Sequence, residues 1–286
     1  MQTINGKELA QNILDRISLQ TRDLSRPPHL TIIISGENPA SEVYVARKQE
    51  TAATVGITTH LIRTEVSESA LLEAVRAAGN DAATDGIIVQ LPVPGLDATS
   101  VLAAIPADKD VDGLNPLSLG RLYNGSETLV SATPLAVMEA LRFIAESEGQ
   151  SATEYLEGRH ALIINRSILF GKPLAALLLE KNATVTVAHS RTRDLAEVSS
   201  QADILISATG QHGLITGDHI RQNAVVIDAG FAKEDGRIFG DVDPESVRAK
   251  ASWLSPVPGG IGPLGVAMLM NNTLKAALAH LEQHRS

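Results

Sequence analysis

The sequence predicts a two-domain α/β protein built on parallel sheets, and three observations support this. Short apolar runs alternate with helical patterns almost from end to end, which is the order typical of parallel sheets. The chain has 286 residues, more than the ~100–200 of one ordinary domain. Its residues are 44% hydrophobic but only 3% aromatic, so aliphatic side chains must fill the cores.

The first series of strands and helices lies before residue 107. We expect strands at residues 30–35, 57–62 and 86–91, with helices at 41–55 and 67–78 between them. The run GIIVQL at 86–91 is apolar except for Gln90, and Pro92 and Pro94 close it. Such a run is typical of a strand that a parallel sheet buries on both faces.

The middle of the chain has a different character. Residues 107–116 (ADKDVDGLNP) are loop-forming, and Pro134 then opens a helix expected at 135–145, because proline is favoured in a first helical turn. Residues 146–158 are polar and contain Gly and Ser. We predict that they form the linker region between the domains.

The second series follows that linker. Strands are expected at 161–164, 184–188, 204–207 and 225–228, with helices at 174–181 and 195–201. This order predicts a parallel, doubly wound sheet. A long apolar helix at 266–281 lies beyond the last strand, and we expect it to pack back on the first domain.

Composition and charge exclude several classes of function. The net charge of -9 argues against general affinity for nucleic acid or anionic membranes, which both require basic surfaces. The chain has no cysteine, which excludes disulfides, thiolate catalysis and iron–sulfur clusters. The N-terminus lacks a signal-peptide pattern, and no apolar run reaches the ~18 residues of a membrane span. No HExxH or comparable cluster indicates a metal.

A nucleotide site is indicated after the strand at 161–164. A helix that starts directly after a strand offers free N–H groups and a favourable dipole to a dinucleotide phosphate. The usual G-x-G-x-x-G is absent, but Asn165 stands where a first glycine is common and Gly171 permits close approach at the helix start. Asparagine tolerates left-handed backbone better than most residues. The alternative interpretation is an ordinary strand-to-helix turn.

The next strand of this series indicates which cofactor is bound. NAD-binding units commonly place Asp or Glu after this strand, where it binds the ribose 2′-hydroxyl. Here Ser190, Arg191 and Arg193 follow the strand, with no acid before Asp194. A hydroxyl and two guanidinium groups suit a 2′-phosphate, and Arg166 is a further candidate. The pattern favours NADP, the alternative being that the arginines are only solvated.

Polar residues of the first domain indicate a second site. Tyr44 and Lys48 are four residues apart on an expected helix, so they share a face. The ring can stack on a flat ligand while the ammonium reaches its reactive carbon, although on the residues alone a surface pair is the simpler interpretation. Gln90 needs hydrogen-bond partners, either within the core or in a pocket past the carboxyl end of its strand.

Two loops have unusual composition. Residues 108–113 (DKDVDG) invite a calcium interpretation, but they lack the EF-hand spacing and its terminal Glu. Residues 256–263 (PVPGGIGP) are too rigid and too glycine-rich for regular structure. They can lay bare backbone against a ligand, or form a plain turn between the domains.

Several segments, taken in order and spacing, carry a specific resemblance. They are SEVYVARKQETAATVGI, DGIIVQLPVP, KDVDGLNP, ATVTVAHSRT, VVIDAGF, GDVD and SPVPGGIGPLGVAMLMNNT. Together they resemble the methylenetetrahydrofolate dehydrogenase/cyclohydrolase family over essentially the whole chain.

The resemblance implies a fold and two activities. Residues 1–140 form a folate-binding catalytic domain that the helix at 267–286 rejoins, and residues 141–266 form a Rossmann-type NADP domain, with the site in the cleft between them. The reaction oxidises 5,10-methylenetetrahydrofolate with NADP and hydrolyses the methenyl product to 10-formyltetrahydrofolate. The resemblance further implies a cytoplasmic homodimer that acts on polyglutamylated folate and serves purine biosynthesis.

The resemblance also assigns residues to the site. Catalysis falls to Lys48, Gln90 and Tyr44, while Asp112 binds the pterin ring. The substrate-binding set is Tyr44, Lys48, Val89, Gln90, Leu91, Asp112, Pro256, Gly259 and Gly260. The cofactor-binding set is Asn165, Arg166, Ser167, Ser190, Arg191, Gly210 and Phe231.

The chain departs from the usual family pattern at several positions, which bear on cofactor preference, hydrolase efficiency and contacts to the folate tail. They are Glu50 for a basic residue, Ser131 and Ala132 for Pro-Cys, Ala136 and Asn165 for Gly, His212 for Pro, and Leu264 and Gly265 for Met-Thr. Two alternative functions are a dehydrogenase without efficient cyclohydrolase and a non-catalytic folate or NADP sensor. Retention of Lys48 and Gln90 counts against both.

Overall fold

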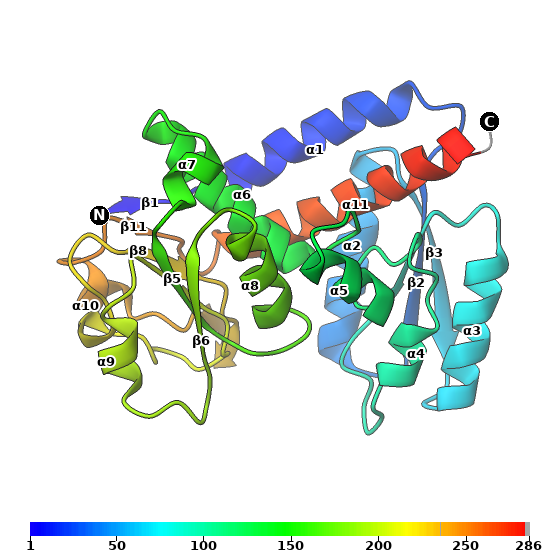
Figure 1. Ribbon diagram of the computed structural model, residues 1–286. Helices are drawn as coiled ribbons and strands as arrows, with labels where there is room; N and C mark the ends of the chain where they lie inside the picture. Colours follow the sequence, from blue (N-terminus) through cyan, green and yellow to red (C-terminus); the bar gives the residue numbers. More distant parts are fainter. Residues whose placement is uncertain (235, 284–286) are drawn as a thin grey trace. The chain divides into compact units, whose positions relative to one another are not determined.

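The computed structural model describes residues 1–234 and 236–283 (Figure 1). The chain divides into two compact units. Unit 1 consists of Met1–Ala10 and Thr133–Gly265, and unit 2 consists of Gln11–Ala132 and the chain from Val266 onward. Each unit has its own parallel sheet, so the predicted α/β fold class is confirmed.

Unit 2 is built on a three-stranded parallel sheet with the order β3-β2-β4, and Figure 1 labels the first two of these strands, β3 and β2. The strands are β2 (His29–Ser35), β3 (Thr58–Thr64) and β4 (Gly86–Val89). The helices are α2 (Pro39–Thr54), α3 (Glu68–Asn80), α4 (Thr99–Ala103) and α5 (Pro116–Tyr123), with most of α1 (Gly6–Arg22) and α11 (Ile261–Gln283).

The core of unit 2 fixes the start of β4 against the loop that follows α4. Every residue of β4 is buried, and Ile87 and Val89 pack in one cluster with Leu71 and Val75 of α3. Burial of each such side chain is worth roughly 1.5–3 kcal/mol. The Ile87 amide donates to the Lys109 carbonyl at 2.7 Å. The loop that carries Asp112 is therefore built onto the sheet.

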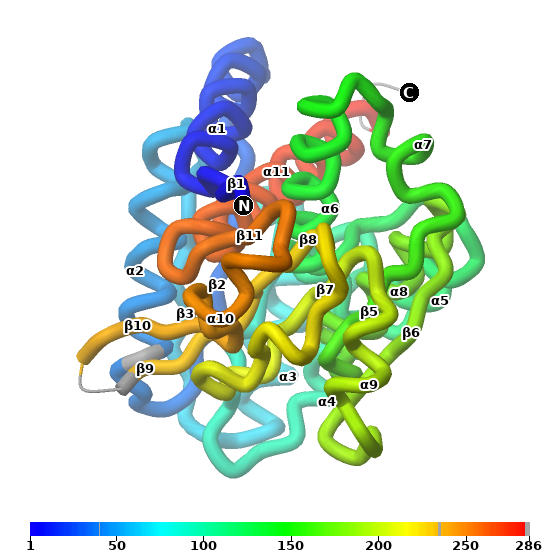
Figure 2. The backbone as a smooth tube through the Cα atoms, turned by 90° about the vertical axis from the view of Figure 1, so that its left-hand side faces the viewer, coloured from blue at the N-terminus to red at the C-terminus, as the bar shows by residue number. Residues whose placement is uncertain are grey.

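Unit 1 is built on a six-stranded parallel sheet with the order β1-β11-β8-β7-β5-β6, which Figure 2 shows strand by strand. The strands are β1 (Gln2–Thr3), β5 (His160–Ile164), β6 (Thr184–Ala188), β7 (Ile204–Ser207), β8 (Val225–Asp228) and β11 (Trp253–Leu254). A separate antiparallel pair is formed by β9 (Ala232–Glu234) and β10 (Arg237–Phe239). The helices are α6 (Ala132–Ser147), α7 (Ala152–Leu156), α8 (Gly171–Leu179), α9 (Leu195–Ser199) and α10 (Pro244–Val247), with a short 3-10 turn, η1 (Gly217–His219).

The strand order of unit 1 reverses between β5 and β7. From β5 the chain moves first to β6 on one side and then to β7 and β8 on the other. Ligands of doubly wound sheets bind beyond the carboxyl ends of the strands at such a reversal. The loops after β5, β6, β7 and β8 are therefore the ones that can contact a dinucleotide.

The structure differs from the sequence expectation at several boundaries. Residues 146–158, expected as a linker, contain α7, which a capping box between Ser151 and Glu154 starts. The last helix begins at Ile261 rather than at 266, because proline in a first helical turn costs no hydrogen bond. The strand expected at 86–91 ends at Val89.

The first ten residues also lie elsewhere than expected. We expected residues 1–140 to form one domain, but β1 pairs with β11 in the sheet of unit 1, with Gln2 opposite Trp253. Gly6 packs so closely on Gly260 that a Cβ atom there would lie 1.8 Å from the Gly260 carbonyl oxygen. Backbone pairing and this contact place the N-terminus in unit 1.

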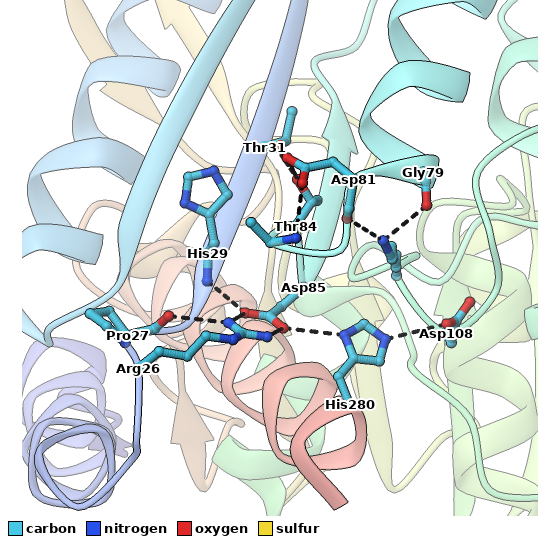
Figure 3. A network of polar contacts seen from close by, with 12 residues as sticks. Arg26, Pro27, His29, Thr31, Gly79, Asp81, Thr84, Asp85, Asp108 and His280 are labelled. Atoms are coloured by element: carbon cyan, nitrogen blue, oxygen red, sulfur yellow. Dashed lines mark hydrogen bonds and ion pairs between the residues drawn. The ribbon is translucent and has the colours of Figure 1, made fainter. Parts of the chain in front are cut away.

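The C-terminal helix rejoins unit 2 through a buried polar network (Figure 3). The His280 ring contacts Asp85 at 3.2 Å through Nδ1 and Asp108 at 3.3 Å through Nε2. Arg26 donates two hydrogen bonds to the same Asp85 carboxylate, at 2.6 and 2.7 Å, and the His29 amide donates a third. Burial raises the pKa of Asp85, but these donors outweigh it and hold the pKa at about 2.

Two further properties concern membranes and metals. Within residues 1–234 and 236–283, no helix combines the length and the apolar character that a membrane crossing requires. In the same part of the chain, no group of three or more His, Asp or Glu side chains is arranged to hold a metal ion.

Candidate active site

Helix α2 and strand β4 bring Lys48 and Gln90 together. Lys48 Nζ donates a hydrogen bond to Gln90 Oε1 at 2.9 Å. Gln90 follows the last residue of β4, and its side-chain Nε2 donates to the Leu91 carbonyl at 2.8 Å. The amide of Gln90 is thus held at the carboxyl end of the strand and not in the core. This is the position where α/β sheets bind ligands.

Tyr44 lies one helical turn before Lys48 on α2. Its side chain is 39% exposed, and the partial burial raises the pKa of its hydroxyl above the usual value. Residues four apart on a helix share a face. The Tyr44 ring and the Lys48 amine therefore lie on the same side of α2.

Lys48 and Asp112 influence each other's charge. Burial lowers the pKa of the Lys48 ammonium, and the Asp112 carboxylate opposes this shift. Burial raises the pKa of Asp112, and the Lys48 charge opposes that shift. A neutral amine is thus more accessible near neutrality at Lys48 than at a lysine on the surface.

The loop before and after Asp112 is fixed by buried hydrogen bonds. The Asp110 carboxylate accepts from the Asn115 amide at 2.7 Å and from Ser118 Oγ at 2.9 Å, and burial raises its pKa to about 6. From α11, Asn272 Nδ2 donates to the carbonyls of Val111 at 2.8 Å and Val130 at 2.7 Å. Asp110, one of the carboxylates that invited a calcium interpretation, is thus used to hold this loop.

Asn165 organises the loop between β5 and α8. Its Oδ1 accepts from the Ser167 amide and hydroxyl, both at 2.8 Å, and from the Gly171 amide at 3.2 Å. Its Nδ2 donates to the Ala208 carbonyl at 2.6 Å, across the strand reversal. Asn165 does not adopt the left-handed backbone that the sequence suggested. Its side chain caps the loop by hydrogen bonds instead.

The start of α8 fits a phosphate. A Cβ atom at Gly171 would lie 1.9 Å from the Asn165 carbonyl oxygen, so only glycine allows the helix to start this close to β5. The helix has nine residues, and its start carries the positive end of the helix dipole, which favours a phosphate. The amides of Gly171 and Lys172 donate to Asn165 Oδ1 and to the Ser167 carbonyl, so they hold the loop itself. Arg166 is exposed at the edge of this loop.

The loop after β6 presents donors to solvent. His189 closes a turn with Thr192, donating its amide to Thr192 Oγ1 at 2.9 Å, and Arg191 donates its amide to His189 Nδ1 at 3.1 Å. Ser190 and Arg191 are exposed on this turn. A hydroxyl and a guanidinium group, both donors, fit a phosphate group better than they fit a ribose hydroxyl.

The remaining expected site residues fall in two places. Val89 and Leu91 flank Gln90 in unit 2. Pro256, Gly259 and Gly260 lie in unit 1, in a turn that the Gly260 amide closes on the Pro256 carbonyl at 2.7 Å. Gly210, with φ of 71°, and Phe231, 48% exposed, follow β7 and β8 in unit 1.

Two family models match this chain. The catalytic domain of tetrahydrofolate dehydrogenase/cyclohydrolase matches residues 4–112, and the NAD(P)-binding domain matches residues 131–281. The chain belongs to the tetrahydrofolate dehydrogenase/cyclohydrolase family. The family resemblance of the sequence motifs is thereby confirmed.

Members of the tetrahydrofolate dehydrogenase/cyclohydrolase family match this chain along their whole length. The bifunctional protein FolD of Oceanobacillus iheyensis is 43% identical over 281 residues, covering 96% of this chain and 96% of the relative. The bifunctional protein FolD 1 of Rubrobacter xylanophilus is 44% identical over 281 residues, with the same coverage of both chains.

Solved structures of this family have the same fold. The bifunctional FolD of Campylobacter jejuni superposes with a TM-score of 0.92 at 35% identity, covering 98% of this chain and 99% of that one. The Trypanosoma brucei enzyme, complexed with NADP cofactor and inhibitor, superposes with a TM-score of 0.88 at 33% identity, covering 99% and 98%.

Sequence reasoning missed the residues that support these loops. Asn272 and Asp241 are buried polar side chains that hold backbone near the expected folate and cofactor residues. Both lie in segments that carried the family resemblance, MLMNNT and GDVD. A polar residue within an otherwise apolar run was the available signal, but it does not reveal the partner.

Proposed function

We propose that this chain oxidises 5,10-methylenetetrahydrofolate to 5,10-methenyltetrahydrofolate with NADP and hydrolyses the product to 10-formyltetrahydrofolate. The observation that carries the proposal is the Lys48–Gln90 hydrogen bond beyond β4, with Asp112 near enough to act on the Lys48 charge. This arrangement occurs in a chain that belongs to a family of bifunctional enzymes.

Unit 2 binds the folate. The Tyr44 ring stacks on the pterin, and the Asp112 carboxylate accepts N–H groups of the aminopyrimidinone, a charge-assisted contact. Val89 and Leu91 line the strand end beside Gln90. The bare backbone of Pro256, Gly259 and Gly260 supplies further contacts to the substrate.

The chemistry that NADP would supply when bound is acceptance of a hydride from the methylene carbon, which would leave a methenyl cation on the folate. No proton moves at that carbon in this step. The contribution of the chain is therefore alignment, which Tyr44 and Asp112 provide by fixing the pterin.

Hydrolysis needs a base and then an acid. Neutral Lys48 takes a proton from the water that attacks the methenyl carbon, and the resulting ammonium returns a proton to the ring nitrogen as the carbon–nitrogen bond breaks. The folate leaves as 10-formyltetrahydrofolate, with one net proton released. Gln90 Oε1 holds the amine in place at 2.9 Å. Burial of Lys48 lowers its pKa and so supplies the neutral form.

Unit 1 binds the cofactor. The loop that Asn165 and Ser167 form at the start of α8 would hold the pyrophosphate, and Ser190, Arg191 and Arg166 would hold the 2′-phosphate. Gly210 and Phe231 contact the other half of the cofactor. The guanidinium groups of Arg191 and Arg166 only donate, and the Ser190 hydroxyl can donate as well, a combination that suits phosphate and supports NADP over NAD as the preferred cofactor.

Family membership supports further proposals that concern the wider setting. We propose that unit 2 carries the folate and unit 1 carries NADP; the expected boundary at residue 140 thereby moves to Thr133, where unit 1 resumes. We also propose that the enzyme is a cytoplasmic homodimer, that it accepts polyglutamylated folate, and that its product serves purine biosynthesis.

The proposal is tested by mixing purified protein with NADP and methylenetetrahydrofolate and following the absorbance of NADPH and of methenyltetrahydrofolate. We expect NADPH to form while methenyltetrahydrofolate is consumed faster than in protein-free buffer. If methenyltetrahydrofolate decays only at the protein-free rate, the chain is a dehydrogenase alone. If both ligands bind and no NADPH forms, the chain is a sensor.

A further inference from the structure

Two buried acidic side chains at the carboxyl edge of the unit 1 sheet have no role in the proposed mechanism. Asp228 is the last residue of β8 and is 2% exposed, and Asp241, which follows β10, is fully buried. Their hydrogen-bond donors are backbone amides and one serine hydroxyl. Both carboxylates therefore bind protein backbone from inside the molecule.

Asp241 fixes the turn that follows β7. Its Oδ2 accepts from the Thr209 amide at 2.6 Å and from Ser207 Oγ at 2.6 Å, and its Oδ1 accepts from the Gln211 amide at 3.0 Å. Gly210 lies between the two bonded amides and has φ of 71°. One carboxylate thus determines the path of the backbone on both sides of Gly210.

Asp228 fixes the second loop and also Asp241. Its Oδ1 accepts from the Gly230 amide at 2.9 Å and from the Asp241 amide at 3.1 Å, and its Oδ2 accepts from the Val242 amide at 3.0 Å. Phe231 follows Gly230 directly. Asp228 therefore places Asp241, which in turn places Gly210.

Two glycines leave room for these carboxylates. A Cβ atom at Gly230 would lie 2.1 Å from Asp241 Oδ1, and one at Gly240 would lie 2.0 Å from Asp228 Oδ2. No side chain fits at either position without moving a buried carboxylate. The loops and the acidic pair form one close-packed unit.

A buried pair of carboxylates costs free energy through desolvation and mutual repulsion. A role that only fills space would not offset this cost. Burial and the nearby Asp241 charge raise the pKa of Asp228 to about 6, against the lowering effect of the backbone donors. Buried charges are costly unless donors satisfy them. Here the satisfied donors belong to the loops after β7 and β8, so the benefit of the pair lies in loop geometry.

These loops lie on the side of the strand reversal opposite to β6. A dinucleotide spans the reversal, with one mononucleotide on each side. Because Ser190 and Arg191 after β6 suit the adenosine 2′-phosphate, the loops after β7 and β8 face the nicotinamide half.

We propose that Asp241, held by Asp228, is a positioning residue for the nicotinamide half of the cofactor, because it sets the backbone around Gly210. The inference rests on the proposed function. If it holds, NADP affinity and hydride transfer depend on the Asp241 carboxylate, which accepts the backbone amides on both sides of Gly210.

The test is Asp241→Asn, with Asp243→Asn as the matched control. Asp243 is two residues away and its carboxylate also accepts backbone amides, but these are the amides of Glu245 and Ser246 in α10, which the carboxylate caps. The readouts are the NADP Kd by titration, the KM for NADP against that for folate, and the cyclohydrolase rate measured without cofactor.

We expect Asp241→Asn to raise the Kd and KM for NADP at least about tenfold. The folate KM and the cyclohydrolase rate should stay within about twofold of wild type, because neither needs NADP. The control should match wild type in all readouts. The milder Ser207→Ala removes one donor to Asp241 and should raise the NADP Kd by about twofold to tenfold.

Three results would overturn the inference. One is wild-type NADP affinity in both Asp241→Asn and Ser207→Ala. Another is a parallel loss of cyclohydrolase and NADP binding, which would make Asp241 only structural. A wild-type chain that neither binds nor reduces NADP would refute the proposed function itself and the inference with it, and the wild-type titration identifies that case before any variant is made.

Discussion

Replacing Lys48 with methionine should separate the two proposed activities. Methionine keeps much of the aliphatic stem, so the packing on α2 survives. The amine is lost, and with it the proton transfers of hydrolysis, which are worth typically 10²–10⁴-fold in rate. Hydride transfer requires no proton at the reacting carbon, so part of the dehydrogenase activity should remain.

The structure also indicates how Lys48→Met should affect stability and folate binding. Lys48→Met leaves Gln90 Oε1 without its 2.9 Å donor, which should cost about 1 kcal/mol of stability or less. Because the Lys48 charge lowers the pKa of Asp112, its loss raises that pKa further and weakens the pterin acceptor. We therefore expect a moderate rise in folate KM and a folded protein.

The assay follows methenyltetrahydrofolate in two ways. Supplied directly, it should be hydrolysed by Lys48→Met no faster than in protein-free buffer. Generated from methylenetetrahydrofolate and NADP, it should accumulate. Lys275→Met is the control, since Lys275 is an exposed lysine on α11 in the same unit, and both activities should stay near wild type.

Two results would refute this reasoning. If Lys48→Met hydrolyses methenyltetrahydrofolate at the wild-type rate, Lys48 only positions the substrate. If both activities vanish while circular dichroism shows a folded protein, Lys48 is required to seat the folate and the two steps are not separable.

Three further predictions concern the substrate, the cofactor and pH. Asp112→Ala should weaken folate binding by about 1.5–3 kcal/mol and lower kcat/KM of both activities together; an unchanged folate Kd by titration would show that Asp112 is not the pterin ligand. NADP should be preferred over NAD by at least about tenfold, roughly 1.4 kcal/mol, and equal kcat/KM for the two cofactors would contradict the assignment of Ser190 and Arg191. The hydrogen bond from His280 to Asp85, together with Asp108, raises the pKa of His280 against the effect of burial, so its stabilising contribution is full below its unfolded pKa of ~6.5 and is lost as pH rises through the folded pKa. His280→Gln should therefore lower Tm more at about pH 6 than at about pH 9, with His60→Gln as an exposed control; an equal Tm loss at both pH values would argue against a charged His280.

The sequence predicted the buried strands well because their signal is local. The runs at 204–207 and 225–228 are apolar up to their last residue, the run at 184–188 alternates threonine with apolar residues, and the structure forms strands with those bounds. Two-residue strands such as β1 and β11 carry no such signal, since they exist only through pairing with each other and β8. The helix α11 begins at Ile261, five residues before the predicted start. Gly262 and Pro263 suggested irregular structure, but the first turn of a helix accepts both residues.

The site was predictable in its residues but not in its contacts. Tyr44 and Lys48 could be placed on one face from helix periodicity. The Lys48–Gln90 bond joins residues 42 positions apart, and the Asn272–Val111 bond joins residues 161 apart. Such pairings depend on the tertiary fold. For the same reason Asn165 was expected to supply a left-handed backbone, whereas its side chain supplies the hydrogen bonds that hold the loop.

The most direct test of the account is a carbon balance in one tube. Methylenetetrahydrofolate with an isotopically labelled methylene carbon is incubated with the protein and NADP, and the label and NADPH are measured together. We expect the label to end in the formyl group of 10-formyltetrahydrofolate, with one NADPH formed per labelled formyl group and a rate above that of spontaneous methenyl hydrolysis. Label that stops at methenyltetrahydrofolate, or formyl product without matching NADPH, would contradict it.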